Sequence, residues 1–359
     1  MKPKAGTAKA VISNLENQVA KKVVSESLHL RKGESVTVET WNNGFELARK
    51  VVIEARKIGA HPIMIFEDED SYVESFKITP KDSVGKMGKH EYELLASTNA
   101  YFFIPNEVLE GYTKRLNPSD VDESTSYGDS WYDAAEKAKL RGARMSFGFA
   151  GRELARILGK KLDDIVIHQL KATLVDFEAM NKMGKELASK LSSNSEVVLD
   201  SGGLKLELEL ADGIRIEDGI VDDADVSSGY NMAYLPPGLI SRNVKPSSVN
   251  GKVRLSPSLT WRGIVSDATL EFEAGRLVKW NSKSSKERLD SIIKDHSENE
   301  RKIESFTIGF NPLLRYGYGE DRFVAGSMSI SGLGFSGIVR NGALLSGGTF
   351  LVNKGKRVR

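Results

Sequence analysis

The feature of this sequence that most constrains its fold is a change of pattern near residues 192–196. Before that point, short apolar runs alternate with segments whose apolar residues recur at helical spacing. Parallel strands need crossover helices, so this alternation predicts an α/β unit with a parallel sheet covered on both faces. After that point, short strand-like runs follow one another between Gly, Asp and Ser residues, which predicts a strand-rich α+β unit.

The elements of the first part can be placed from these patterns. We expect strands at 35–40, 61–66, 100–104 and 144–147, and helices at 15–28, 45–58, 131–140 and 151–158. Residues 162–191 carry one continuous apolar stripe, which predicts a single long helix. The second part has one charged helix, at 283–296.

Chain length supports a division into two parts. At about 100–200 residues per domain, 359 residues correspond to two domains. The polar run Ser192-Ser193-Asn194-Ser195 is the predicted boundary. We therefore expect an α/β domain over residues 1–195 and a strand-rich domain over residues 196–359.

Composition excludes several classes of site. The chain has no cysteine, so it has no disulfide, thiolate metal site or cysteine nucleophile. A net charge of +2 gives no argument for a nucleic-acid partner. No run approaches the roughly 18 apolar residues that span a bilayer, so we expect a cytoplasmic protein without a membrane partner.

Three short motifs have both a functional and a structural interpretation. Residues 332–337 match GxGxxG, but no helical segment follows them, so a turn between strands is favoured over a dinucleotide site. Residues 148–151 lie between a predicted strand and a predicted helix, where a tight turn is favoured over an anion site. Residues 67–70 follow a strand, and a loop that caps the next helix is favoured over a cation site.

Several segments together resemble one known family. Residues 30–38 (LRKGESVTV) and 55–60 (ARKIGA) resemble the first strand and helix of the aminopeptidase T and aminopeptidase S family. Residues 272–278, 308–312 and 320–330 are similar to later segments of the same family, in the same order. These relatives are metal-dependent exopeptidases, also called leucyl aminopeptidases. The resemblance implies their two-part fold, a dinuclear metal centre and a homodimer.

The resemblance also implies where metal ligands would stand. The family has a Glu after its Pro-x-Gly step, where this chain has Leu239. It has a Glu ahead of its Gly-x-Asn-Pro segment. In this chain Ser305 stands at that position, and Glu304 is the residue next to it. It has a His where Ser329 stands, and a final His-x-Asp pair, yet no Asp, Glu or His follows Asp321.

These replacements bear directly on metal chemistry. Two divalent cations need carboxylates and imidazoles, whereas Leu has no donor atom and neutral Ser is a poor ligand. The candidate ligands that remain are Glu304, Glu320 and Asp321. They predict no metal or a single divalent metal rather than a dinuclear site. Three basic residues of the same part could instead bind an anionic ligand: Arg315, Arg322 and Arg340.

We therefore expect a family member that kept the fold, lost most of its metal ligands and binds a small or peptidic ligand. One alternative is an active metal-dependent aminopeptidase that releases N-terminal residues from peptides. Another is a structural or interaction protein in which Leu239, Phe310 and Phe335 fill the former pocket. Whether the chain is an enzyme stays open at this point, and no catalytic residue is assigned.

Overall fold

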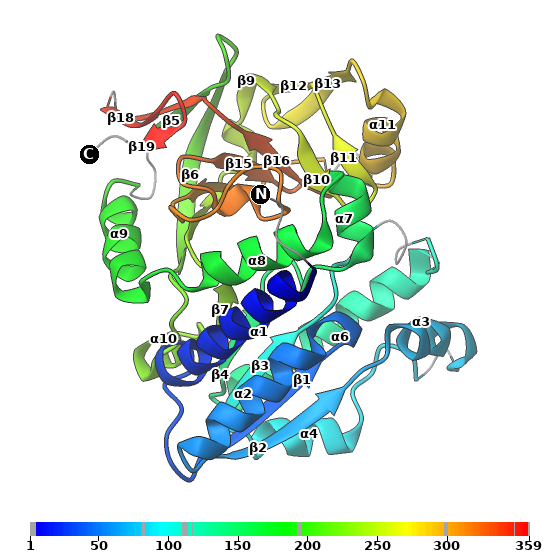
Figure 1. Ribbon diagram of the computed structural model, residues 1–359. Helices are drawn as coiled ribbons and strands as arrows, with labels where there is room; N and C mark the ends of the chain where they lie inside the picture. The colour runs from blue at the N-terminus through cyan, green and yellow to red at the C-terminus, as the bar shows by residue number, and fades with distance from the viewer. Residues whose placement is uncertain are drawn as a thin grey trace. The chain divides into compact units, whose positions relative to one another are not determined.

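The computed structural model describes residues 5–80, 83–109, 114–116, 118–191, 196–297, 301–347 and 349–357. The chain forms two compact units (Figure 1). The first comprises Met1–Phe177 and Gly219–Pro236, and the second comprises Glu178–Asp218 and Pro237–Arg359. The predicted boundary at Ser192–Ser195 lies outside the described residues. This division groups residues 178–195 with the second unit and residues 219–236 with the first.

The first unit is built on a five-stranded sheet in the order β2-β1-β3-β4-β7, with every described pair parallel. Its strands are β1 (Ser35–Thr40), β2 (His61–Phe66), β3 (Ala100–Ile104), β4 (Arg141–Met145) and β7 (Met232–Leu235). The predicted parallel sheet is confirmed, and β1, β2 and β3 have the predicted bounds. The prediction of a fourth strand at 144–147 was wrong in position, because β4 begins at Arg141.

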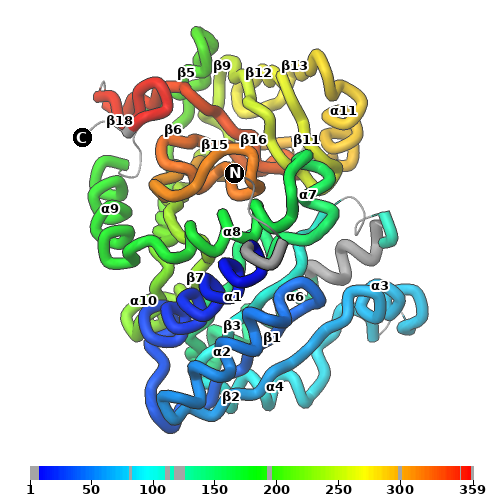
Figure 2. Tube along the Cα trace, viewed as in Figure 1, coloured from blue at the N-terminus to red at the C-terminus, as the bar shows by residue number. Residues whose placement is uncertain are grey.

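Helices cover both faces of this sheet (Figures 1 and 2). They are α1 (Ala5–Lys22), a π-helical turn (Val23–Ser27), α2 (Phe45–Lys57), α3 (Glu69–Ile78), α4 (Lys89–Ala96), α6 (Pro118–Lys137), α7 (Arg152–Leu158), α8 (Leu162–Thr173) and α10 (Asp223–Ser227). Tyr101 of β3 packs with Leu95 of α4 and Ala135 of α6. Helix α2 packs on β1 and β2, and α1 packs on α2 and α8. Among the described residues, no helix is both long and apolar enough to cross a bilayer.

The prediction of one long helix over residues 162–191 was wrong. The chain instead forms α8 and then α9 (Phe177–Ser189), with a turn and bend at residues 174–176. Leu174 donates to the carbonyl of Lys171, a three-residue step that ends α8. Thr173 and Val175 are β-branched, and Asp176 immediately before α9 is a residue type that starts helices. The apolar stripe alone hid this break.

The second unit is rich in strands, as predicted, and its paired strands are antiparallel. Its main path runs β16-β15-β14-β8-β6-β5-β17-β18-β19, with β9, β12 and β13 branching from β6. Its strands are β5 (Glu196–Asp200), β6 (Lys205–Glu217), β8 (Leu239–Val244), β9 (Asn250–Arg254), β10 (Ser258–Thr260), β11 (Gly263–Val265), β12 (Ala268–Glu273), β13 (Arg276–Ser282), β14 (Ser305–Gly309), β15 (Met328–Ser331), β16 (Ser336–Val339), β17 (Ala343–Ser346), β18 (Thr349–Asn353) and β19 (Lys356–Arg357).

Short helical segments complete the second unit. They are η3 (Pro246–Ser248), α11 (Lys286–Lys294) and η4 (Asp321–Phe323). Helix α11 matches the expected charged helix. The GxGxxG segment connects β15 to the antiparallel β16, so it is the predicted turn and not the start of a helix.

Candidate functional site

The strand register places Leu239, Ser305 and Ser329 on one face of the second unit's sheet. β14 lies between β8 and β15, and side chains two residues apart in a strand point to the same side. On β14, Thr307 is opposite Ser241 of β8 and Ser329 of β15, while Gly309 is opposite Leu239. The three positions that the family resemblance assigns to metal ligands therefore share a face, although they are far apart in the sequence.

This face carries hydroxyl groups, whereas the opposite face is mostly apolar. We call it the hydroxyl face, and its members are Ser241, Ser305, Thr307, Ser329, Ser331 and Ser336. Thr307 and Ser329 are buried and share a hydrogen bond between their hydroxyls. Ser331 and Ser336 share another, of 2.7 Å. The intervening residues Ile240, Phe306, Ile308, Met328 and Ile330 are buried on the other side.

The donors on this face do not fit a dinuclear metal centre. Leu239 supplies no donor atom, and the Ser329 hydroxyl already shares its hydrogen bond with Thr307. Across the described part of the chain, no group of three or more His, Cys, Asp and Glu side chains is arranged to hold a metal ion. Neutral hydroxyls cannot balance the charge of two divalent cations.

The candidate ligands Glu304, Glu320 and Asp321 have different surroundings. Glu304 precedes β14, where its side chain is exposed. Glu320 is buried at the start of η4. Asp321 is buried beside it and forms an ion pair with Arg340.

The Asp321 carboxyl has its charge and hydrogen-bond partners within the second unit. It also accepts a 2.7 Å hydrogen bond from the backbone N–H of Gly317, and Arg340 lies 4.4 Å from the ring centre of Tyr316. Burial raises the pKa of Asp321 above its ordinary value, and the Arg340 cation acts in the opposite direction. Arg340 therefore neutralises a carboxylate of the same unit.

The other two predicted anion-binding residues have different surroundings. Arg315 is exposed, and Arg322 lies over the Phe323 ring at 5.0 Å. Asp321 and Arg340 are thus two of the six predicted side chains that the structure brings together. Leu239, Phe310 and Phe335, which would fill the pocket in the structural alternative, are all buried.

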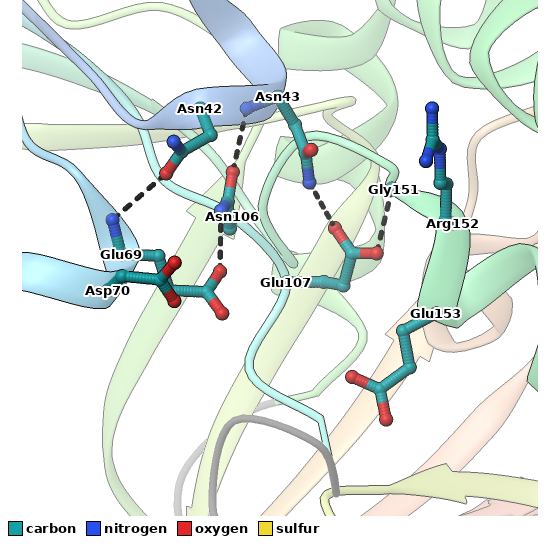
Figure 3. Close-up of a pocket in the computed structure, with 9 residues that line it drawn as sticks. All are labelled: Asn42, Asn43, Glu69, Asp70, Asn106, Glu107, Gly151, Arg152 and Glu153. Atoms are coloured by element: carbon teal, nitrogen blue, oxygen red, sulfur yellow. Dashed lines mark hydrogen bonds between the residues drawn. The ribbon is translucent and has the colours of Figure 1, made fainter. Parts of the chain in front are cut away.

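A second site lies in the first unit, at the carboxyl ends of its parallel strands. A cavity of about 260 Å³ opens between the loops that follow β1, β2 and β3 and the start of α7 (Figure 3). β2 pairs on one side of β1 and β3 on the other, so successive connections leave in opposite directions. Ligands of open α/β sheets bind in the crevice at such a point. We call this cavity the strand-end crevice.

Amides and carboxylates form one continuous network in the strand-end crevice (Figure 3). Asn42 accepts a 2.9 Å bond from the backbone N–H of Glu69, and Asn106 donates to the Glu69 carboxylate over 2.6 Å. Asn106 also accepts from the backbone N–H of Asn43 at 2.9 Å, and the Asn43 amide donates to Glu107 over 3.3 Å. The remaining lining residues are Asp70, Gly151, Arg152 and Glu153.

Glu107 ties this network to the start of α7. Its carboxylate accepts hydrogen bonds from the backbone N–H groups of Gly151 at 2.7 Å and Leu154 at 3.4 Å. A carboxylate of the same unit therefore takes the place that the sequence offered to an external anion at residues 148–151. Burial raises the pKa of Glu107 to about 7, despite these donors.

The sequence analysis singled out two segments that border this crevice, residues 67–70 and 148–151, and missed its other residues. Residues 67–70 cap the next helix as predicted, since Asp68 accepts from the backbone N–H of Ser71 at the start of α3. The same segment contributes Glu69 and Asp70 to the crevice. Asn42, Asn43, Asn106 and Glu107 went unnoticed. The signal that could have found them is a polar pair shortly after each of two buried strands.

Comparison with known proteins gives one family match. Residues 13–301 match the model of the family described as thermophilic metalloprotease, M29. No curated protein matches the sequence.

Two solved structures share the fold over nearly the whole chain. Wild-type AmpT from Thermus thermophilus superposes with a TM-score of 0.71 at 16% identity, covering 96% of this chain and 99% of that one. The 2,5-dihydroxypyridine dioxygenase from Pseudomonas putida KT2440 superposes with a TM-score of 0.62 at 12% identity, covering 97% and 96%. Together with the family match over most of its length, these results show that the chain belongs to the thermophilic metalloprotease family M29.

Proposed function

We propose that this M29 family member has kept the fold without the two-metal hydrolytic centre and binds a small or peptidic ligand. The observation that carries the proposal is the hydroxyl face. The three positions assigned to ligands by resemblance come together on it, and they hold Leu239, Ser305 and Ser329. A neutral face of this kind cannot hold a pair of divalent cations or generate a metal-bound nucleophile.

The strand-end crevice is the ligand site that we propose. Among the residues that the structure describes, its lining has four carboxylates, Glu69, Asp70, Glu107 and Glu153, and one cation, Arg152. Arg115 pairs with Glu69 and Asp70, whereas Glu107 accepts hydrogen bonds from backbone and amide N–H groups. Carboxylates and amide oxygens are acceptors for an ammonium group. A small amine, such as the free amino end of a dipeptide, matches this chemistry.

The first test concerns metal and hydrolysis. Protein purified without chelator should contain much less than one metal ion per chain, and it should not hydrolyse aminoacyl-p-nitroanilides with added cobalt, zinc or manganese. The same sample serves for both measurements. Stoichiometric metal with turnover that the Glu304→Ala variant abolishes would establish the active aminopeptidase instead.

The second test concerns the crevice. Isothermal titration should detect a dipeptide with a free amino group and give binding at least about tenfold weaker for its N-acetylated form, since a charged hydrogen bond is lost. The Glu107→Gln variant should also lose affinity, whereas Glu46→Gln, an exposed carboxylate of α2 outside the lining, should not. Equal binding of the free and acetylated dipeptides, or no binding of either, would contradict the amine assignment.

A further inference from the structure

A cavity of about 740 Å³ lies along the edge of β13 in the second unit. Among the described residues, β13 pairs only with β12, so its other edge is open. Arg276 and Leu277 are consecutive in this strand, where side chains alternate between faces, yet both line the cavity. Val278 also lines it, as the extra residue of a bulge in the pairing with β12. The cavity therefore reaches both faces of β13 along its open edge. We call it the β13 groove.

The charge of the β13 groove is one-sided. Its lining includes Arg276, Arg301 and Lys302 and no carboxylate among the residues that the structure describes. Arg301 donates to the carbonyls of Ile293 and His296 at 3.0 Å, which fixes its guanidinium at the end of α11 while leaving its charge in place. Three cations in one concave surface favour an anionic occupant.

The groove also has an apolar part. Leu277, Val278 and Pro246 line it, and Val278 is 45% exposed. The ring of Trp280 forms another part of the wall, and its indole N–H donates to Asp290 at 2.7 Å, which fixes the orientation of the ring. A fixed aromatic wall beside cations suits a ligand that combines apolar side chains with negative charge.

We propose that the β13 groove binds an extended acidic peptide segment of a partner protein. An extended segment follows the open strand edge, its carboxylates face the three cations, and an apolar side chain contacts Trp280 and Val278. A free inorganic anion would leave the apolar wall uncovered. A second copy in a twofold arrangement would place two basic grooves against each other, which like-charge repulsion opposes.

A protective role is the competing explanation. Exposed edges are often guarded by bulges and basic residues that prevent sheet-to-sheet association. β13 has a bulge at Val278, where the register with β12 shifts between Glu271 and Phe272. Protection requires no cavity and no bound peptide, so a binding measurement separates the two roles.

The test uses the full chain and fluorescence anisotropy of labelled eight-residue peptides. An acidic peptide with a central Phe should bind, and its counterpart with Lys at every acidic position should not. The Arg276→Glu/Lys302→Glu variant should weaken binding by about tenfold or more, because two surface ion pairs are each reversed. Higher salt should weaken binding by the parent chain.

The matched control is Lys279→Glu/Lys283→Glu, which makes the same charge change on and just after β13 but outside the lining. It should keep most of the affinity. Equal loss in both variants would mean a general basic surface, and failure of the parent to bind the acidic peptide would leave only edge protection. Either result overturns the proposal.

Three further outcomes would assign the groove to another occupant. Competition by inorganic phosphate at equal concentration would indicate a small-anion site. A change of molecular mass in the Arg276→Glu/Lys302→Glu variant would indicate a second copy. Much tighter binding by a Glu298→Gln/Glu300→Gln variant would indicate the chain's own acidic residues ahead of Arg301. The strand-end crevice plays no part in these readouts, so the two proposals stand or fall separately.

Discussion

At the scale of single residues, Glu107 couples the strand-end crevice to pH. Burial raises its pKa from 4.5 to about 7, so the folded chain holds this proton more tightly than the unfolded chain does. The free energy of unfolding must then decrease as pH rises from about 4.5 to about 7. Glu39, whose pKa burial also raises to about 7, acts in the same direction.

We predict that Glu107→Gln removes part of this pH dependence. Between pH 5 and pH 8 the parent should lose on the order of 3 kcal/mol more stability than the variant, since each pKa unit corresponds to about 1.4 kcal/mol. Urea unfolding at four pH values measures the difference. The control Glu93→Gln, an exposed carboxylate, should leave the Glu107-dependent slope in place. Parallel profiles for the parent and Glu107→Gln would contradict the assignment.

Arg340 gives a second prediction at this scale. Arg340→Ala leaves the buried Asp321 carboxylate without its cation and should lower the free energy of unfolding by about 3 kcal/mol at pH 8. Because burial already raises the pKa of Asp321, the loss should be smaller at an acidic pH, where the carboxyl takes up a proton. The Arg340→Ala/Asp321→Asn double variant should recover part of the loss in urea unfolding. A loss that is the same at both pH values would mean that packing on Tyr316 dominates.

At the scale of elements, two glycines on either side of α7 have different reasons to be glycine. Gly148, ahead of the helix, has φ +92°, and a Cβ there would lie 2.5 Å from the backbone of Asn106. Gly159, the C-cap, has φ +62° and nothing within 4 Å of its Cβ position. The first glycine is required by both conformation and space, the second by conformation alone.

We predict that Gly159→Ala lowers the free energy of unfolding by about 1 kcal/mol, the usual cost of a left-handed alanine. Gly148→Ala should cost about 3 kcal/mol or more, because the backbone of the β3 loop must move. That movement displaces Asn106 and Glu107, so crevice binding should weaken in this variant alone. Urea unfolding and titration calorimetry check both parts, and equal costs for the two variants would contradict the argument.

The bounds of some strands can be predicted from the sequence, whereas those of β4 cannot. β1, β2 and β3 are short apolar or alternating runs between polar residues, so their bounds could be predicted directly. β4 begins with Arg141, a buried arginine paired with Glu34 at 2.6 Å, and a charged residue at the start of a strand gives no apolar signal. Its true start depends on a partner more than one hundred residues away.

At the scale of the whole molecule, long-range pairing limits what the sequence can reveal. In the sequence, β7 follows β6, a strand of the second unit. It nevertheless pairs with β4 and completes the parallel sheet of the first unit. The strand-end crevice likewise collects side chains from loops after three strands. Predicting either requires the strand order, which local patterns do not contain. The class of each half could be predicted because it depends on local periodicity.

Self-association is the prediction at this scale. The family resemblance implies a homodimer, and β2, the edge strand of the parallel sheet, exposes Ile63 by 48% and Met64 by 39%. We expect sedimentation equilibrium to give a molecular mass of twice the chain mass of 39.5 kDa. The Ile63→Lys/Met64→Lys variant should shift the measured mass toward that of a single chain. Val11→Lys, an exposed apolar residue of α1, is the control. A monomeric parent, or a dimer that tolerates both substitutions, would contradict this expectation.

The hydroxyl face has a consequence for how this chain is made. Clustered carboxylates and imidazoles repel one another or hold protons until metal ions bind, so a chain that carries them matures only as fast as its ions are supplied. Leu239, Ser305 and Ser329 carry no charge across the physiological pH range, and Thr307 and Ser329 satisfy each other. On the function proposed above, this sheet would be made without a metal-loading step, and we expect starvation for trace elements to leave its yield unchanged.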